Sequence, residues 1–160
     1  MSSTIQTESA IEPKTPIPVD IYRLAQYGLL VVIVASVANA VIRVAALAVL
    51  DIPATFLPLR GFTFGSLPLG WGPVVLFSWL GAVGATIVYG VITRYSHRPN
   101  RMFTIVATLV LVLSFGAFLA PLPVLAGAPS AAFAVLALMH VTVAAVSIGM
   151  LPRALGLEDQ

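Results

Sequence analysis

The chain has 160 residues, of which 59% are hydrophobic and 9% are charged, and its formal net charge is +2. Soluble proteins carry charge on roughly a quarter of their residues, so this composition excludes an ordinary soluble domain and indicates a membrane protein with a single domain. Cysteine is absent, which excludes disulfides, thiolate metal sites and a thiol nucleophile.

The N-terminal stretch, residues 1–20, holds Ser, Thr, Glu and Pro with few apolar side chains. A cleavable signal peptide needs a basic start followed by an apolar core, and this stretch has neither. We therefore expect a disordered cytoplasmic tail over residues 1–20. A second, shorter cytoplasmic tail is expected over residues 154–160.

A helix needs about 20 mostly apolar residues to cross the hydrocarbon core of a membrane, and four stretches of the chain meet this length. They cover residues 27–50, 73–93, 102–120 and 130–151. Backbone polar groups in lipid must be satisfied internally, so each stretch should be one continuous helix. The predicted fold class for residues 21–153 is therefore an all-α membrane domain, an antiparallel bundle of four transmembrane helices.

The basic residues indicate the direction of the spans, because short cytoplasmic loops collect Lys and Arg. Of the eight basic residues, those on one side of the spans are Lys14, Arg23, Arg94, Arg98, Arg101 and Arg153. Arg60 lies on the opposite side, and Arg43 lies within the first span. The sequence therefore predicts an N-in/C-in topology, with both termini in the cytoplasm.

The lengths of the connections constrain how the helices pack. The second and third spans are joined by about eight residues, and the third and fourth by a short proline-rich turn, so both pairs should be antiparallel neighbours. The connection from Asp51 to Gly72 is longer and carries Phe56, Phe62, Phe64 and Trp71. Aromatic side chains suit the membrane interface, so we expect this loop on the outer surface or over the outer mouth of the bundle.

Motifs of soluble enzymes are missing from the sequence, including phosphate loops, dinucleotide turns, paired histidines and Gly-x-Ser-x-Gly. No span contains Asp or Glu, which argues against a carboxylate-driven proton or cation transporter. We therefore expect a protein that is not an enzyme and has no catalytic residue, cofactor, metal site or nucleic-acid partner.

Three polar residues lie in one layer of the predicted bundle. At 1.5 Å per residue, Arg43 lies about 12 Å, Asn39 about 18 Å and His140 about 15 Å below the outer boundary. Asn39 and Arg43 are four residues apart and share a helical face, which Ser36 continues. The face of His140 otherwise holds small side chains, Ala137, Ala144 and Ser147. We predict that the first and fourth helices pack together, with Asn39, Arg43 and His140 in a polar cluster inside the bundle.

This cluster has more than one interpretation. It could bind an anion or a polar headgroup, with charge from Arg43 and hydrogen bonds from His140 and Asn39. Alternatively, Arg43 extends to the outer surface, and the other two side chains hydrogen-bond neighbouring helices.

Two further features favour packing and lipid contact. One stripe of the second span holds mainly small and hydroxyl side chains, which indicates close contact within the bundle or with a second subunit: Ser78, Ala82, Ala85, Thr86, Tyr89 and Thr93. The turn after it carries Arg94, Arg98 and Arg101, which fit either a plain topology signal or contact with anionic lipid headgroups.

The pattern resembles a family of small bacterial four-span membrane proteins known only as a domain of unknown function. The matching elements are Asn39 in the first span, the Arg94 to Arg101 turn, and Leu138-Met139-His140 in the fourth span. The resemblance covers residues 23–153 and implies no activity. It places the chain in the cytoplasmic (inner) membrane of a bacterium.

Two functional hypotheses follow from these residues. The first is a non-enzymatic accessory, assembly or lipid-interacting component of that membrane, with lipids, a second copy or another membrane protein as partners. The alternative is a small oligomeric carrier or channel for an anion or amphiphile, which uses Asn39, Arg43 and His140.

Overall fold

The computed structural model describes residues 20–50, 71–119 and 130–156. Within these ranges the chain forms four long helices and one short 3-10 helix. They are α1 (Ile21–Val49), α2 (Trp71–Tyr95), α3 (Pro99–Leu119), α4 (Ser130–Met150) and η2 (Leu151–Leu155). Each long helix is long and apolar enough to span a membrane. The prediction of an all-α membrane protein with four helices packed as a bundle is therefore confirmed.

The helices extend past several of the predicted span ends. Helix α1 begins at Ile21 rather than near residue 27, because the Asp20 Oδ1 accepts hydrogen bonds from the backbone N–H groups of Tyr22 and Arg23 at 2.9 and 3.3 Å. Such an N-cap satisfies backbone donors that would otherwise be unpaired. Helix α3 begins at Pro99, where a proline suits the first helical position. After α4 the chain continues as η2, with Pro152 in its first turn.

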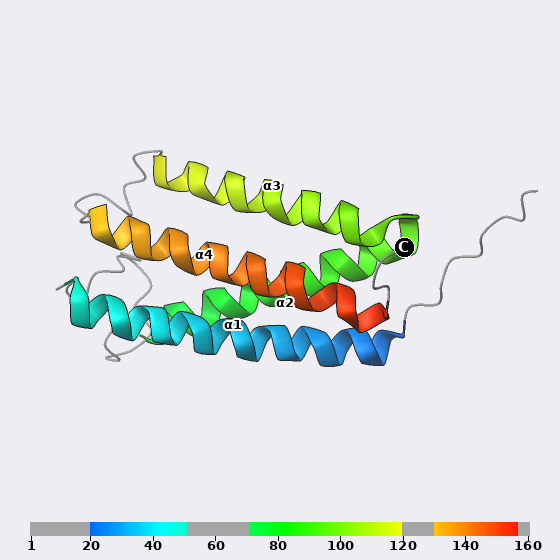
Figure 1. The fold of residues 1–160 in the computed structure, drawn as a ribbon, viewed down its shortest axis with the longest axis horizontal. Coiled ribbons are helices and arrows are strands. Elements are labelled where there is room, and N and C mark those ends of the chain that lie inside the picture. Colours follow the sequence, from blue (N-terminus) through cyan, green and yellow to red (C-terminus); the bar gives the residue numbers. More distant parts are fainter. Residues whose placement is uncertain (1–19, 51–70, 120–129, 157–160) are drawn as a thin grey trace, which may run out of the picture.

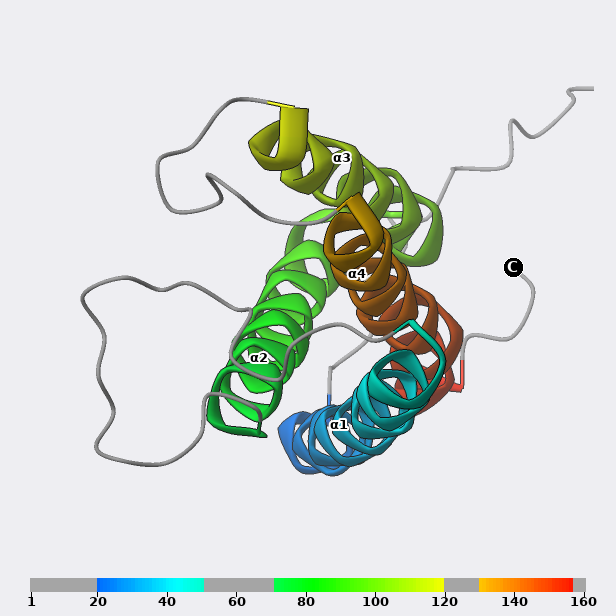
Figure 2. The same ribbon diagram turned by 90° about the vertical axis from the view of Figure 1, so that its left-hand side faces the viewer.

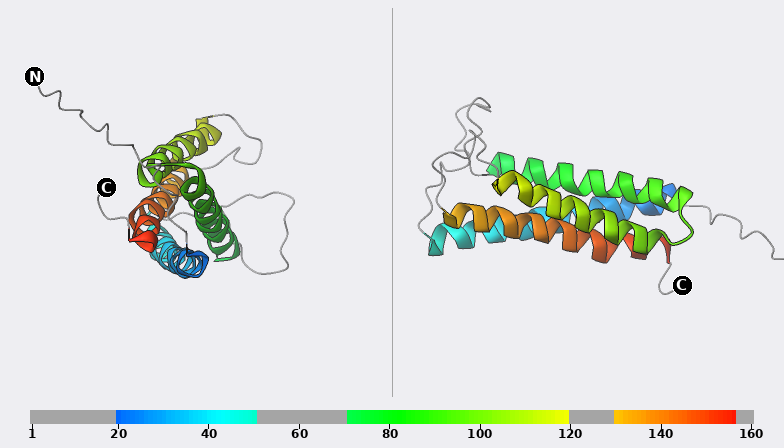
Figure 3. Two further views of the ribbon diagram at one scale, coloured as in Figure 1. Left: turned by 90° about the vertical axis from the view of Figure 1, so that its right-hand side faces the viewer. Right: turned by 90° about the horizontal axis from the view of Figure 1, so that it is seen from above.

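The four helices run in alternating directions, so that the start of α1, the turn between α2 and α3, and the end of α4 lie at one end of the bundle (Figure 1). We call this the inner end and the opposite one the outer end, after the orientation that the sequence predicts. Helix α1 packs against α2 and α4, and α3 packs against α2 and α4 from outside (Figures 2 and 3). The predicted contacts between the first and fourth, second and third, and third and fourth helices are all present.

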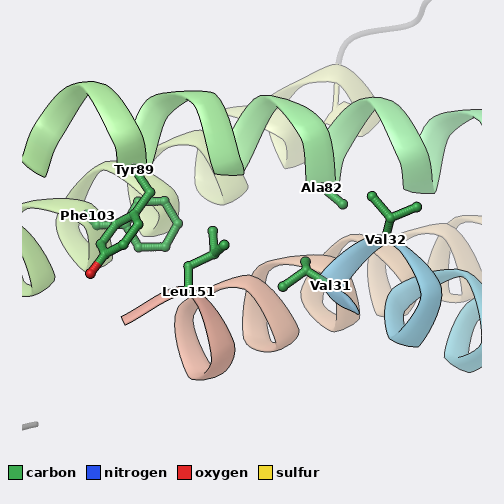
Figure 4. Close-up of a cluster of buried hydrophobic side chains, with 6 residues drawn as sticks. All are labelled: Val31, Val32, Ala82, Tyr89, Phe103 and Leu151. Atoms are coloured by element: carbon green, nitrogen blue, oxygen red, sulfur yellow. The ribbon is translucent and has the colours of Figure 1, made fainter. Parts of the chain in front are cut away.

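The core lies in the inner half of the bundle and draws on α1, α2, α3 and η2, with partly buried side chains of α4 packed against it. Its buried side chains are Val31, Val32, Ala82, Tyr89, Phe103 and Leu151 (Figure 4). The rings of Tyr89 and Phe103 meet edge to face, with centroids 4.9 Å apart, and so join α2 to α3. The Tyr89 hydroxyl donates a hydrogen bond to Asn100 Oδ1 at 2.8 Å, which ties the same two helices. These contacts fix α3 at its inner end.

Helices α1 and α2 approach each other closely at two glycines. A Cβ atom on Gly28 would lie 2.6 Å from Thr86 Cγ2, and one on Gly90 would lie 2.8 Å from Leu24 Cδ2. Real Cβ atoms do not come this near other atoms, so Gly28 requires glycine for this spacing, whereas at Gly90 the end of the flexible Leu24 side chain could move aside. The predicted stripe of small residues on the second span is the face that α2 turns into the bundle, since Ser78, Ala82 and Tyr89 are all buried.

Lipid-facing surface is most extensive on α3. Its apolar side chains are widely exposed, as Leu109, Val112 and Leu113 show. In water such a surface would be unfavourable, whereas in a bilayer it contacts acyl chains. Three predicted segments lie outside the described residues. They are residues 1–19 of the N-terminal tail, residues 51–70 of the long connection, and the proline-rich turn between α3 and α4.

Candidate functional site between the outer halves of α1 and α2

Asn39 is buried within the bundle and bonds to α2. Its side chain is 3% exposed, and Nδ2 donates a hydrogen bond to Ser78 Oγ at 2.8 Å. The Ser78 hydroxyl in turn donates to the carbonyl oxygen of Val74 at 2.7 Å. The amide therefore links two helices through its donor side, as polar residues in membrane helices commonly do.

The acceptor side of the same amide is unused. Asn39 Oδ1 and Ser36 Oγ are both buried and have no hydrogen-bond partner among the described residues. A buried polar atom without a partner costs about 1–3 kcal/mol, and it is correspondingly rare in folded proteins. These two atoms lie on neighbouring turns of one α1 face, which the sequence had assigned to Ser36, Asn39 and Arg43.

Arg43 lies one turn further toward the outer end and packs on an aromatic ring. Its guanidinium carbon is 4.6 Å from the centroid of the Trp71 ring, a cation–π contact. Trp71 is the first residue of α2, so the contact joins α1 to α2 as the Asn39 bond does. The only acidic residue in the described part of the chain is Asp20, at the inner end. No carboxylate among the described residues pairs with Arg43, and its guanidinium lies against the face of the Trp71 ring instead.

His140 is not inside the bundle, and the prediction of a buried three-residue cluster is wrong on this point. Its side chain is exposed on α4, with Nδ1 2.8 Å from the carbonyl oxygen of Leu136. The buried face of α4 passes through Met139 and Ser147, and Val143 lies against Gly81 of α2. The neighbouring position His140 is turned by about 100° from Met139 and so points away.

The contacts of Asn39 and Arg43 identify two residues that sequence reasoning did not place in the site. Ser78 was assigned only to the packing stripe, and Trp71 to the outer loop. The register of α1 against α2 brings them to Asn39 and Arg43, and the same register places Gly28 opposite Thr86. For the pair of Asn39 and Ser78, the sequence offers one signal, which is that each of two adjacent spans contains a polar residue.

A second polar feature lies at the inner end. Arg94 in the last turn of α2, Arg98 between the helices and Arg101 in the first turn of α3 are all exposed. Ser96 Oγ accepts a hydrogen bond from the Arg98 N–H at 3.2 Å. Arg23 at the start of α1 and Arg153 in η2 are exposed at the same end (Figure 1). We call these five arginines the basic end of the bundle. Arg153 also donates a hydrogen bond to the Gly149 carbonyl, which holds it beside α4.

One of three comparisons with known proteins gives a match. No curated protein and no solved structure matches the chain. A protein family matches residues 19–156, a range that runs from just before α1 to the end of η2 and includes both polar features. The chain, a multi-pass membrane protein with four candidate spans, belongs to DUF6069, a family of unknown function.

Proposed function

We propose that this protein is a non-enzymatic component of a bacterial cytoplasmic membrane, which binds anionic lipid headgroups through its basic end. The observation that carries the proposal is the gathering of five exposed arginines at one end of a four-span bundle. Asp20 is the single acid among the described residues there. Both termini then face the cytoplasm, in the N-in/C-in orientation.

Electrostatics supports this assignment. A basic residue near an anionic membrane surface contributes about 1 kcal/mol, so five of them would bind such a surface strongly and in a salt-dependent way. Arg94, Arg98 and Arg101 flank the ends of two candidate spans, and in a bilayer the ends of spans meet the headgroups. The outer end differs, since Arg43 is its only described basic residue and lies against Trp71.

The hydroxyl groups within the spans support a structural role rather than a catalytic one. Most donate to a carbonyl oxygen three or four residues earlier in their own helix: Thr86, Thr93, Thr104, Ser114, Thr142 and Ser147. A hydroxyl held in this way is neither activated as a nucleophile nor aimed at a substrate. The assembly or accessory role therefore needs no chemistry from the spans.

Orientation can be tested directly, because the chain has no cysteine. Single-cysteine variants Gly72→Cys and His97→Cys place a thiol at the outer and inner ends, and a Cβ at Gly72 has no atom within 4 Å. A membrane-impermeant maleimide should label Gly72→Cys in intact cells and His97→Cys only after the membrane is opened. The reverse pattern would overturn the orientation and, with it, contact between the basic end and cytoplasmic headgroups.

Lipid binding can be tested in nanodiscs that contain phosphatidylglycerol and phosphatidylcholine. The triple variant Arg94→Gln/Arg98→Gln/Arg101→Gln should retain phosphatidylglycerol roughly 100-fold less tightly than the parent, from about 1 kcal/mol per arginine. Arg43→Gln is the matched control at the outer end and should keep the parent's selectivity at the inner leaflet. Equal selectivity in the triple variant and the parent would refute the proposed function.

The carrier hypothesis is a second candidate, since Asn39 Oδ1 is buried without a partner among the described residues. It now relies on Asn39 and Arg43, because His140 is exposed. A carrier would move an anion or amphiphile across liposomes, and loss of that transport in Arg43→Gln would support this candidate over a purely accessory role.

A further inference from the structure

The interface of α1 and α2 is built differently in its two halves. In the inner half, two glycines let the helices touch, Gly28 against Thr86 and Gly90 against Leu24. In the outer half, two polar contacts join the helices: the hydrogen bond from Asn39 to Ser78 and the stacking of Arg43 on Trp71. The outer half also buries Ala46 and Val74, so its polar groups lie within a packed interface.

These polar groups leave specific interactions unmet. Asn39 Oδ1 can accept a hydrogen bond, and Ser36 Oγ can donate or accept one, but neither has a partner among the described residues. The edges of the Arg43 guanidinium can donate to an anion, while its face rests on Trp71. Asn39 lies one helical turn from Arg43 and is therefore about 6 Å nearer the membrane centre than Arg43.

We propose that the outer halves of α1 and α2 form a binding site for an anionic amphiphile that carries a hydroxyl or N–H donor on the chain side of its charged group. Arg43 binds the anion and Asn39 Oδ1 accepts the donor. The vertical order of the two residues matches an amphiphile in the outer leaflet, whose charge lies toward water and whose chain points inward. The site shares no residue with the basic end, and only its assignment to the outer leaflet rests on the orientation in the proposed function.

Occupancy requires a change in this interface, because Asn39 Oδ1 is closed off from solvent in the structure. The two helices would part at their outer ends, while the glycine contacts of the inner half remain. The ligand donor then pairs with Asn39 Oδ1, and the anion binds the edges of the Arg43 guanidinium beside the Trp71 ring. Trp71 therefore reports on binding.

The experiment measures fluorescence of Trp71 in the Trp79→Phe variant, since the chain has two tryptophans. The probes are 1-oleoyl lysophosphatidate, whose 2-hydroxyl lies on the chain side of the phosphate, and its analogue with hydrogen in place of that hydroxyl. The hydroxylated probe should bind about tenfold more tightly, as one hydrogen bond to a buried acceptor implies. Glycerol 3-phosphate, which has no chain, should leave the emission unchanged at the same concentrations.

Three variants separate the parts of the site. Arg43→Gln should weaken both lipid probes at least tenfold, and Asn39→Leu should abolish only the preference for the hydroxyl. Ser114→Ala is the matched control, because it removes a hydroxyl of α3 that bonds only within its own helix, so the preference should remain. Gel filtration and thermal unfolding establish that each variant folds.

Several results would overturn the proposal. One is unchanged affinity in Arg43→Gln, and another is a hydroxyl preference that persists in Asn39→Leu. If glycerol 3-phosphate bound as tightly as the lipid probes, the site would bind a small anion and the proposed amphiphile would be excluded. If Asn39→Leu does not fold, the comparison of the two lipid probes on the parent decides, since equal affinities would exclude a donor at Asn39. The arginine variants of the basic end should bind both probes like the parent.

Discussion

Gly28→Ala is the substitution for which the structure predicts the clearest energetic effect. The new Cβ would lie 2.6 Å from Thr86 Cγ2 and 2.8 Å from Thr86 Oγ1. Thr86 cannot simply rotate away, because its hydroxyl donates to the Ala82 carbonyl oxygen at 2.8 Å and its Cβ is branched. Helices α1 and α2 must therefore separate, and overpacking of this kind costs about 1–3 kcal/mol.

The assay is reversible unfolding in mixed micelles, with helicity measured as the fraction of denaturing detergent rises. Gly84→Ala is the matched control on α2, since a Cβ at Gly84 has no atom within 4 Å and should leave the free energy of unfolding unchanged or slightly raised. Thr86→Ala in the Gly28→Ala background should recover part of the loss, because only the Thr86 Cβ, at 3.2 Å, then remains close. A Gly28→Ala protein as stable as Gly84→Ala would refute the close approach of the two helices.

Three further substitutions test separate contacts. Tyr89→Phe removes the hydroxyl bonded to Asn100 and keeps the ring on Phe103, so it should lower the free energy of unfolding by about 0.5–1.5 kcal/mol in the same assay. Ser78→Ala should cost about 0.6–1.7 kcal/mol by removing the partner of Asn39, and a cost near zero would contradict that bond. Asp20→Ala removes the N-cap of α1, and amide hydrogen exchange in the first turn should quicken as about 1 kcal/mol of local stability is lost, while exchange near Ala35 should not change.

The fold was predictable to the extent that it depends on length and apolarity. Four spans follow from the need to cross the hydrocarbon core, and the short connections determine which helices are neighbours. The ends of the helices were less predictable, because a count of apolar residues omits first turns that contain polar residues. The turn after Asp20 and the start of α3 at Pro99 are helical for reasons of capping rather than hydropathy.

The site was only partly predictable. Asn39 and Arg43 share a face because of their spacing, and the structure turns both toward one neighbouring helix. The rotation of α4 could not be predicted, because the lipid-facing and buried sides of a membrane helix are both apolar. The sequence therefore predicts His140 inside the bundle, whereas the structure buries Met139 and exposes His140. Ser78 and Trp71 become partners of Asn39 and Arg43 through the register of α1 against α2. The close approach of Gly28 to Thr86 fixes this register, whereas the long connection between the two helices does not determine it.

The position of η2 has a consequence for how the protein is assembled during synthesis. Leu151 and Ala154 are completely buried, and Leu151 fills the core beside Val31 of α1 (Figure 4). Helices α1 and α2 emerge from the ribosome first and can pair through their glycines, yet the inner end of that hairpin stays uncovered until η2 arrives. A nascent chain that stops within α4 would therefore contain all of α1–α3 and still lack the side chain that completes the inner part of the core.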